Sequence, residues 1–315
     1  MIGFISPTLR HLEAGLLASK VIDFIGVRSA AELKEKVAGA EAALIGNSAY
    51  DSGAAQTLRS ATSLRWIQTT SIGIDNLMSD PPRRDVVVTN AGGLNAPAVA
   101  EHAVTLLLAL SRNLRRSLEC QRVGWWARQE LAPAVRSLAG RQIVCLGYGA
   151  VGREVARKLA AFDAEVTVLT RSGQGAPPAR WILPYESLGA VLPTADAVIL
   201  ALPLAPWTRG IIGRHELALM KPTAVLVNVG RGPLVDEVAL AEALTEGRLA
   251  GAGLDVFAAE PLSKDSPLWK CPGTILTPHL GGQGGDGERL LVQLIHENAA
   301  RLKHGQPLAN VMTIR

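Results

Sequence analysis

Gly147-Tyr-Gly149-Ala-Val-Gly152 is the stretch of sequence that decides the fold. An apolar run at 143–146 precedes it and a helix-forming run from Arg153 follows it, so the glycines lie between an expected strand and an expected helix. In that context the first glycine allows a tight turn, the second lets a pyrophosphate approach the backbone, and the third lets the helix pack against the strand. The free N–H groups at the start of the helix attract phosphate. The pattern predicts a dinucleotide site; a glycine turn without a ligand is the alternative.

Short aliphatic runs alternate with helical stretches along the whole chain, a pattern typical of parallel sheets with crossover helices. The predicted fold class is therefore α/β. Strands are expected at 2–5, 21–25, 43–46, 66–70 and 86–89, and in a second set at 141–147, 165–170, 197–202, 224–229, 252–256 and 274–278. Expected helices run from 97 to 116, from 153 onward and from 287 to 303, and 174–180 is expected to be a surface loop.

Composition narrows the function classes. The chain has 315 residues, 48% of them hydrophobic, enough for about two domains. Its net charge of +4 is spread along the sequence without a basic stripe, so no nucleic-acid partner is expected. No apolar stretch is long enough for a membrane span, and the N-terminus lacks the pattern of a secretory signal. Three cysteines without CxxC spacing predict neither disulfides nor a metal site and favour a cytoplasmic location.

Arg171 lies at the end of the second expected strand of the dinucleotide unit, 19 positions after Gly152 (171 − 152). An NAD site usually has an acidic residue there, whereas an arginine pairs with the 2′-phosphate of NADP. Thr170 and Ser172 add hydroxyl groups, and residues 166–185 contain no carboxylate. The sequence therefore predicts NADP as the preferred cofactor, with NAD possible. A solvated surface arginine is the alternative.

Four further motifs carry a family resemblance. They are Thr70-Ser-Ile-Gly73-Ile-Asp75, Asn228-Val-Gly-Arg231-Gly-Pro-Leu-Val-Asp236-Glu237, Gly253-Leu-Asp255-Val-Phe-Ala-Ala-Glu260-Pro261 and Thr277-Pro278-His279-Leu-Gly-Gly. With them the chain resembles the D-isomer-specific 2-hydroxyacid dehydrogenases, most of all the glyoxylate/hydroxypyruvate reductase branch. The resemblance implies two Rossmann-like domains, one flavodoxin-like and one dinucleotide-binding, with the active site in the cleft between them. Residues 1–96 plus 284–315 would form the substrate-binding domain and residues 97–283 the NAD(P)-binding domain.

The resemblance also implies the site residues. Arg231, Glu260 and His279 would be catalytic, and their chemistry suits reduction of a 2-keto acid: a cation for the carboxylate and carbonyl oxygen, an acid to protonate that oxygen, and a group to orient the acid. The backbone N–H groups of Ile72 and Gly73 would bind the substrate carboxylate opposite Arg231. The expected cofactor contacts are Thr105, Gly147, Gly149, Ala150, Val151, Gly152, Arg153, Thr170, Arg171, Ser172, Leu202, Pro203, Val229, Gly230, Asp255, His279 and Gly281.

The expected activity is NADPH-preferring reduction of a small 2-keto acid, glyoxylate or hydroxypyruvate, to a D-2-hydroxy acid. One alternative is a 3-phosphoglycerate dehydrogenase-type enzyme, for which Arg10 is the candidate phosphate ligand. Another is an NAD(P)H-sensing binding protein on the same fold. A homodimer is expected, because Trp125 and Trp126 fall where the family has a dimer-contacting arm, although a substrate contact for these two residues is an equal alternative.

Overall fold

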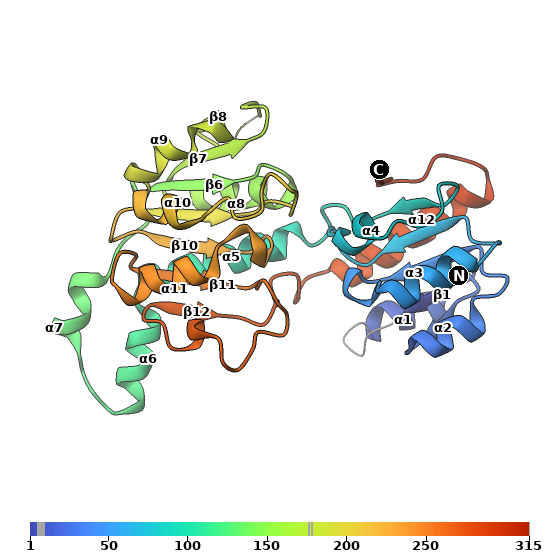
Figure 1. The fold of residues 1–315 in the computed structure, drawn as a ribbon, viewed down its shortest axis with the longest axis horizontal. Helices are drawn as coiled ribbons and strands as arrows, with labels where there is room; N and C mark the ends of the chain where they lie inside the picture. Colours follow the sequence, from blue (N-terminus) through green and yellow to red (C-terminus); the bar gives the residue numbers. More distant parts are fainter. Residues whose placement is uncertain (5–9, 176, 178, 315) are drawn as a thin grey trace. The chain divides into compact units, whose positions relative to one another are not determined.

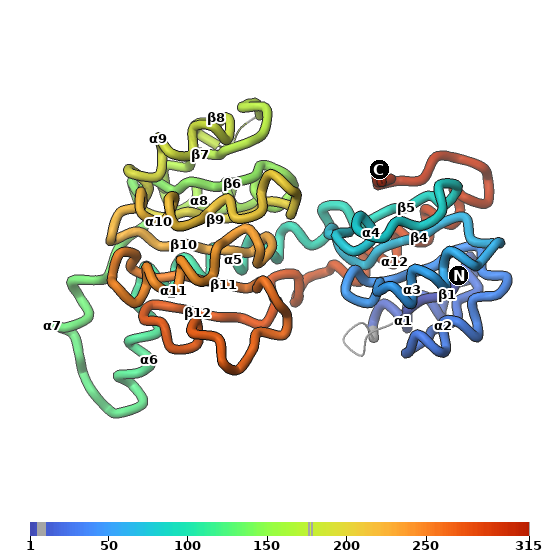
Figure 2. Tube along the Cα trace, viewed as in Figure 1, coloured from blue at the N-terminus to red at the C-terminus, as the bar shows by residue number. Residues whose placement is uncertain are grey.

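The computed structural model describes residues 1–4, 10–175, 177 and 179–314, and the chain divides into two compact units. Unit 1 is Met1–Asn95 with Gly284–Arg315, and unit 2 is Ala96–Gln283. The observed boundary lies one residue before the expected one, because Ala96 is already the first residue of a helix. Figure 2 shows the chain passing from unit 1 to unit 2 at this helix and returning before the last helix.

The elements of unit 1 come from both ends of the chain. They are β1 (Ile2–Phe4), α1 (Arg10–Leu17), β2 (Ile25–Val27), α2 (Ala30–Lys36), β3 (Ala42–Ile45), η1 (Asn47–Ala49), α3 (Ser52–Ser60), β4 (Trp66–Thr69), α4 (Asp75–Ser79), β5 (Val87–Thr89) and α12 (Gly287–Lys303). The described strands form a five-stranded parallel sheet in the order β2-β1-β3-β4-β5, which is the flavodoxin-like order. Leu291 and Ile295 of α12 pack with Leu12 and Leu16 of α1, so the C-terminal segment completes the core of this unit.

Unit 2 contains the remaining elements. They are α5 (Ala96–Ser111), α6 (Leu114–Arg122), α7 (Arg128–Leu131), η2 (Ala132–Ala134), β6 (Gln142–Leu146), α8 (Ala150–Ala160), β7 (Glu165–Thr170), β8 (Trp181–Pro184), η3 (Tyr185–Ser187), α9 (Leu188–Val191), η4 (Leu192–Thr194), β9 (Ala197–Leu200), α10 (Arg214–Leu219), β10 (Val225–Asn228), η5 (Gly232–Leu234), α11 (Glu237–Thr245), β11 (Gly251–Leu254), η6 (Pro267–Trp269) and β12 (Thr274–Leu276).

The sheet of unit 2 is parallel and seven-stranded within the described residues, in the order β12-β11-β10-β9-β6-β7-β8 (Figure 1). It contains the doubly wound Rossmann order, with the strand reversal between β6 and β9. One apolar cluster packs α5 and α8 against one face of the sheet, and a second packs α10 and α11 against the other. The fold class predicted from the sequence is confirmed. Loops that follow the strands gather at one edge, where open α/β sheets bind ligands.

Two expected elements are displaced. The second strand is Ile25–Val27 rather than 21–25, because the Ser19 hydroxyl accepts hydrogen bonds from the N–H groups of Val21 and Ile22 and holds that segment in a turn. The helix expected from Arg153 begins at residue 150, since residues 150–152 form its first turn. The first strand was expected to reach Ile5, which lies outside the described residues, as do residues 176 and 178 of the expected loop.

Two further differences concern elements that were not expected. The helix predicted over 97–116 is two helices, because Asn113 adopts a left-handed backbone conformation, with φ of 54°, between α5 and α6. Strand β8 was not predicted, because Pro184 and the short length of the run hide its strand character. It pairs with β7 at the sheet edge, where a proline is tolerated.

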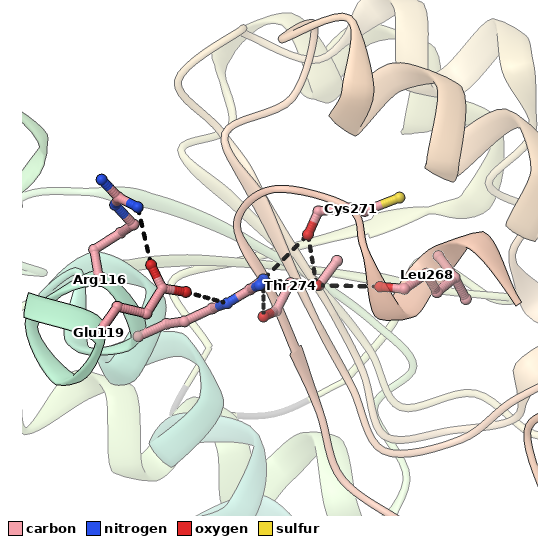
Figure 3. Close-up of polar contacts among 6 residues, drawn as sticks. Arg116, Glu119, Leu268, Cys271 and Thr274 are labelled. Atoms are coloured by element: carbon pink, nitrogen blue, oxygen red, sulfur yellow. Dashed lines mark hydrogen bonds and ion pairs between the residues drawn. The ribbon is translucent and has the colours of Figure 1, made fainter. Parts of the chain in front are cut away.

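Helices α6 and α7 extend from the body of unit 2 in Figure 1. The first turn of α6 is anchored, because the Arg115 guanidinium donates to the carbonyl oxygens of Cys271 (3.1 Å) and Thr274 (2.9 Å). Glu119 accepts from both Arg115 and Arg116, as Figure 3 shows for the latter. A cavity of about 220 Å³ beside α6 is lined by residues at the amino ends of the strands, at the edge opposite the glycine loop.

Cys120, Cys145 and Cys271 are buried free thiols, and burial raises the pKa of the Cys145 thiol to about 12. Among the described residues, no helix is both long enough and apolar enough to cross a membrane.

Candidate active site

The glycine loop connects β6 to α8 at the carboxyl edge of the sheet. Gly147 has a φ of +101°, and a Cβ there would lie 2.7 Å from the carbonyl oxygen of Ala201. A Cβ on Gly152 would lie 2.0 Å from the carbonyl oxygen of Gly147, so helix and strand approach each other too closely for a side chain. A Cβ on Gly149 would meet no atom within 4 Å. The loop is therefore tightly packed on its protein side and open at Gly149, the position that a pyrophosphate would approach.

Side chains next to the glycine loop brace it. Arg153 donates from Nε to the carbonyl oxygen of Tyr148 at 3.2 Å, and its guanidinium lies 5.6 Å from the centre of the Tyr148 ring. The Tyr148 hydroxyl accepts a hydrogen bond from the N–H of Ala179 at 3.1 Å. Ala150 and Arg153 are exposed on the first turns of α8, and Val151 is half-buried. The loop is thus linked to the segment that follows β7.

The residues expected to determine the preference for NADP over NAD lie at the end of β7. Thr170 is buried, whereas Arg171 and Ser172 are exposed. The Ser172 hydroxyl accepts from the N–H of Gln174 at 3.3 Å and closes the turn after the strand. Since β7 is the neighbour of β6 in the sheet, these residues lie beside the strand that leads into the glycine loop.

His279 and Glu260 form a hydrogen-bonded pair. The distance from His279 Nδ1 to Glu260 Oε2 is 2.7 Å, and Glu260 Oε1 accepts from the N–H of Phe257 at 3.0 Å. The hydrogen bond that His279 donates to Glu260 raises the pKa of His279 by more than burial and the nearby charge of Arg231 lower it. The pKa of Glu260 is lowered: burial acts in the opposite direction, but the bonds from His279 and Phe257 prevail. His279 therefore keeps its proton to higher pH than an ordinary histidine, and its side chain is 52% exposed.

Arg231 follows β10, the neighbour of β11. Asn228, the last residue of β10, accepts from the N–H of Gly230 (3.0 Å) and donates to the carbonyl oxygen of Arg231 (2.9 Å), which fixes the turn. The Arg231 guanidinium donates to the carbonyl oxygen of Gly230 at 2.7 Å, and its charge acts on the pKa of both Glu260 and His279. Arg231, Glu260 and His279 thus lie close enough for their charges to influence one another.

Asp255 holds the backbone of the histidine turn. Its carbonyl oxygen accepts the N–H of His279 (2.9 Å), and its carboxylate accepts the N–H groups of Leu280 and Gly281 (2.8 Å each). The carboxylate is 3% exposed and is also bonded by the Thr277 hydroxyl at 2.6 Å. His279 itself has a left-handed φ of 54°, so this turn needs the support that Asp255 provides.

His102 of α5 completes the network around Asp255. Its Nε2 lies 3.2 Å from an Asp255 carboxylate oxygen and 2.9 Å from the Thr277 hydroxyl. Burial would raise the pKa of Asp255, but the hydrogen bonds from His102, from the Thr277 hydroxyl and from the two backbone N–H groups together lower it. Sequence reasoning missed this role of His102, because no local pattern links a residue on a long helix to a turn far along the chain. The expected contact between Asp255 and the cofactor stays a prediction.

The other expected cofactor residues lie at the same edge of unit 2 or on α5. Gly230 packs closely, since a Cβ there would lie 2.8 Å from the carbonyl oxygen of Leu202. Leu202, Val229 and Gly281 are buried, whereas Pro203 is exposed. Thr105 is exposed on α5 with its hydroxyl donating to the carbonyl oxygen of Glu101 at 2.8 Å.

The expected carboxylate-binding loop follows β4 in unit 1. Asn90 donates to the carbonyl oxygen of Ile72 (2.9 Å), and the Ser71 hydroxyl donates to that of Gly73 (3.1 Å), so both carbonyls are held. In the described part of the chain, no acceptor is bonded to the N–H groups of Ile72 and Gly73. The side chain of Arg10 lies outside the described part of the structure.

A Rossmann unit that combines an open glycine loop with an imidazole–carboxylate pair and an arginine at one edge defines the class of nicotinamide-dependent oxidoreductases. Groups of histidine, cysteine and acidic side chains that could hold a metal ion are absent from the described residues.

Comparison with known proteins identifies the family. The chain matches the D-isomer specific 2-hydroxyacid dehydrogenase, NAD binding domain, over residues 104–281, more than half of its length. It is 34% identical over 257 residues to a glyoxylate reductase of Pyrococcus furiosus, covering 80% of this chain and 76% of that protein. A D-3-phosphoglycerate dehydrogenase of Mycobacterium bovis is 37% identical over 235 residues, 74% of this chain and 44% of that protein.

A solved structure agrees with these matches. The D-isomer specific 2-hydroxyacid dehydrogenase from Xanthobacter autotrophicus, in complex with NADPH and MES, superposes with a TM-score of 0.82 at 27% identity, covering 100% of this chain and 98% of that chain. The chain therefore belongs to the D-isomer specific 2-hydroxyacid dehydrogenases and is an NAD(P)-dependent oxidoreductase. The resemblance drawn from its motifs is confirmed.

Proposed function

We propose that this chain reduces small 2-keto acids to D-2-hydroxy acids with NADPH as the preferred reductant, and that glyoxylate and hydroxypyruvate are its first candidate substrates. The observation that carries the proposal is the His279–Glu260 pair, 2.7 Å apart, with the charge of Arg231 acting on both. The glyoxylate reductase of Pyrococcus furiosus supports the substrate class, since it is 34% identical to this chain.

The glycine loop fits a dinucleotide. The open space above Gly149 and the N-terminal N–H groups of α8 suit a pyrophosphate, while the left-handed turn at Gly147 leaves no room for a larger residue. When bound, the reduced nicotinamide supplies a hydride to the keto carbon. The proposed contacts to the cofactor are those predicted from the sequence, with the glycine loop and the end of β7 as the principal ones.

The chain's own residues would complete the reaction. Arg231 binds the substrate carboxylate and polarises the keto oxygen, since its planar guanidinium matches a carboxylate. His279 donates its proton to that oxygen, and Glu260 orients the imidazole and favours its protonated form. The backbone N–H groups of Ile72 and Gly73 stay predicted ligands of a substrate carboxylate, because no acceptor is bonded to them in the described part of the chain.

Steady-state kinetics test the reaction. We expect turnover of glyoxylate or hydroxypyruvate, with larger 2-keto acids assayed in parallel and with NADPH and NADH each as reductant. Absence of turnover with every acid, in the presence of measurable NADPH binding, would favour a cofactor-sensing protein instead. The 37% identity to a D-3-phosphoglycerate dehydrogenase favours a second candidate. The keto acid that corresponds to 3-phosphoglycerate, 3-phosphohydroxypyruvate, therefore belongs in the reduction assay. Faster reduction of this phosphorylated acid than of glyoxylate and hydroxypyruvate would replace the proposed substrate class.

Cofactor preference is proposed from the exposed Arg171 at the end of β7. Its guanidinium would pair with the 2′-phosphate of NADP, and the NADPH complex of the Xanthobacter relative supports this choice. In Arg171→Asp, the ratio of kcat/KM for NADPH to that for NADH should fall by roughly 100-fold, about the value of one charge-assisted bidentate contact. A wild-type preference for NADH would contradict the proposal.

We further propose a homodimer in which α6 and α7 contact a second copy of the chain. Trp126 is 89% exposed, and the neighbouring Val123 and Trp125 are also exposed, which is a large apolar surface for an unpartnered segment. The N–H of Trp125 donates to the carbonyl oxygen of Cys120 at 2.9 Å, so the segment turns directly after α6. An exposed aromatic surface of this kind is typical of protein interfaces.

A further inference from the structure

An aromatic pair, Tyr185 and Trp207, lies at the carboxyl edge of unit 2 outside the residues assigned so far. The ring centroids are 5.4 Å apart and the ring planes are inclined by 39°. Tyr185 directly follows β8 as the first residue of η3, and Trp207 lies in the loop after β9. Because β6 and β7 lie between β8 and β9 in the sheet, the ring contact spans the ends of the strands that lead to the glycine loop and to Arg171.

The register of the strands places Tyr185 next to Arg171. Thr170 pairs with Pro184, so the next residues along these two parallel strands are Arg171 and Tyr185. Burial raises the pKa of Tyr185, and the positive charge of Arg171 opposes this rise, as expected for groups within electrostatic range. Tyr185, one member of the aromatic pair, therefore lies next to Arg171, the residue proposed to bind the 2′-phosphate.

The loop that carries Trp207 is closed by its own hydrogen bonds. The Thr208 hydroxyl is fully buried, donates to the carbonyl oxygen of Pro203 (2.9 Å) and accepts from the N–H of Ala205 (2.7 Å). Trp207 itself is 48% exposed although its ring contacts Tyr185. The indole is thus held in place while much of its surface stays open, a preorganised surface for another planar group.

We propose that Trp207, supported by Tyr185, is the stacking surface for the adenine ring of the bound cofactor. The inference rests on the proposed function, because Arg171 can position adenine here only if it binds the phosphate of the adenosine ribose. Adenine is attached to that same ribose, so anchoring its 2′-phosphate at the end of β7 brings the base to the neighbouring aromatic pair. Stacking on an aromatic side chain is favourable for any base, since every base presents a π-face.

Calorimetric titration of the full-length protein tests this assignment without turnover. The titrants are NADP⁺, 2′,5′-ADP, which lacks the nicotinamide, and nicotinamide mononucleotide, which lacks the adenine. Trp207→Ala should raise the Kd for NADP⁺ and for 2′,5′-ADP by roughly 5- to 100-fold, and leave that for the mononucleotide unchanged. Trp207→Phe retains an aromatic face and should stay within about 3-fold of wild type.

The matched control is Trp269→Ala, because Trp269 is also about half-exposed but lies in η6 beside β12, at the other edge strand of the sheet. This variant should bind all three titrants as wild type does. Equal Kd values for 2′,5′-ADP in wild type and Trp207→Ala would overturn the inference alone. If wild type binds neither NADP⁺ nor 2′,5′-ADP, both the inference and the proposed cofactor fail.

Discussion

At the scale of single residues, the hydrogen bond to the Glu260 carboxylate is the main reason that the pKa of His279 is raised. The raised pKa of His279 means that the imidazolium, the form needed to protonate a keto oxygen, persists to higher pH than in an ordinary histidine. The reduction rate should therefore fall as pH rises through the pKa of His279. In Glu260→Gln this fall should move to lower pH, with kcat/KM near neutrality reduced roughly 10- to 100-fold. A pH–rate profile that coincides with wild type would contradict this role.

The imidazole itself should matter more than its partner. His279→Ala removes the proton donor and should lower kcat by about 10²- to 10⁴-fold, the range expected for a general acid, while the Kd for NADPH stays within about 3-fold of wild type. Kinetics and equilibrium titration of the same preparation separate the two effects. Near-normal turnover in this variant would exclude His279 as the acid.

At the scale of an element, the turn 277–281 depends on Asp255. Replacing the buried carboxylate by an amide in Asp255→Asn places an NH₂ group toward N–H donors and should lower the free energy of unfolding by about 2–4 kcal/mol. Because the same carboxylate holds the N–H groups of Leu280 and Gly281, which directly follow His279, kcat should fall as well. Thermal unfolding and steady-state kinetics measure both effects.

Asp196→Asn is the matched control for the turn. Asp196 is also a hydrogen-bonded carboxylate of unit 2, paired with Lys221 and accepting from the N–H of Gln142, but it lies at the amino ends of the strands. Asp196→Asn should lower the free energy of unfolding and leave kcat at the wild-type value. If Asp255→Asn lowered stability and left kcat at the wild-type value, the turn would be structural only.

At the scale of the whole molecule, the proposed dimer would use the exposed tryptophans between α6 and α7. The double substitution of Trp125 and Trp126 by serine should convert the proposed dimer to a monomer, since each buried interface tryptophan contributes roughly 2–4 kcal/mol. Trp269→Ser changes a tryptophan of η6 that is as exposed as Trp125, and it should leave the dimer intact. Sedimentation velocity distinguishes the species, and a monomeric wild-type protein would refute the proposal.

Sequence reasoning succeeds where the signal is local. The strand Glu165–Thr170 and the helix Gly287–Lys303 have the predicted bounds, because consecutive residues determine strand and helix character. The break at Asn113 and the edge strand Trp181–Pro184 were missed, since a single left-handed residue and a short, proline-ended run change no periodic pattern. The division into two domains follows from the resemblance to a family, whereas the strand order of each sheet comes from the parallel pairing in the structure.

The amino-acid sequence by itself determined the α/β class, the glycine loop and the residue types of the candidate site, because these depend on neighbouring residues and their chemistry. Only the tertiary structure decided that His279 meets Glu260, that Asp255 with His102 supports the histidine turn, and that Tyr185 meets Trp207. The physical reason is that parallel strands align residues from distant segments at one edge of a sheet. Contacts made there depend on strand order and register, which no local pattern encodes.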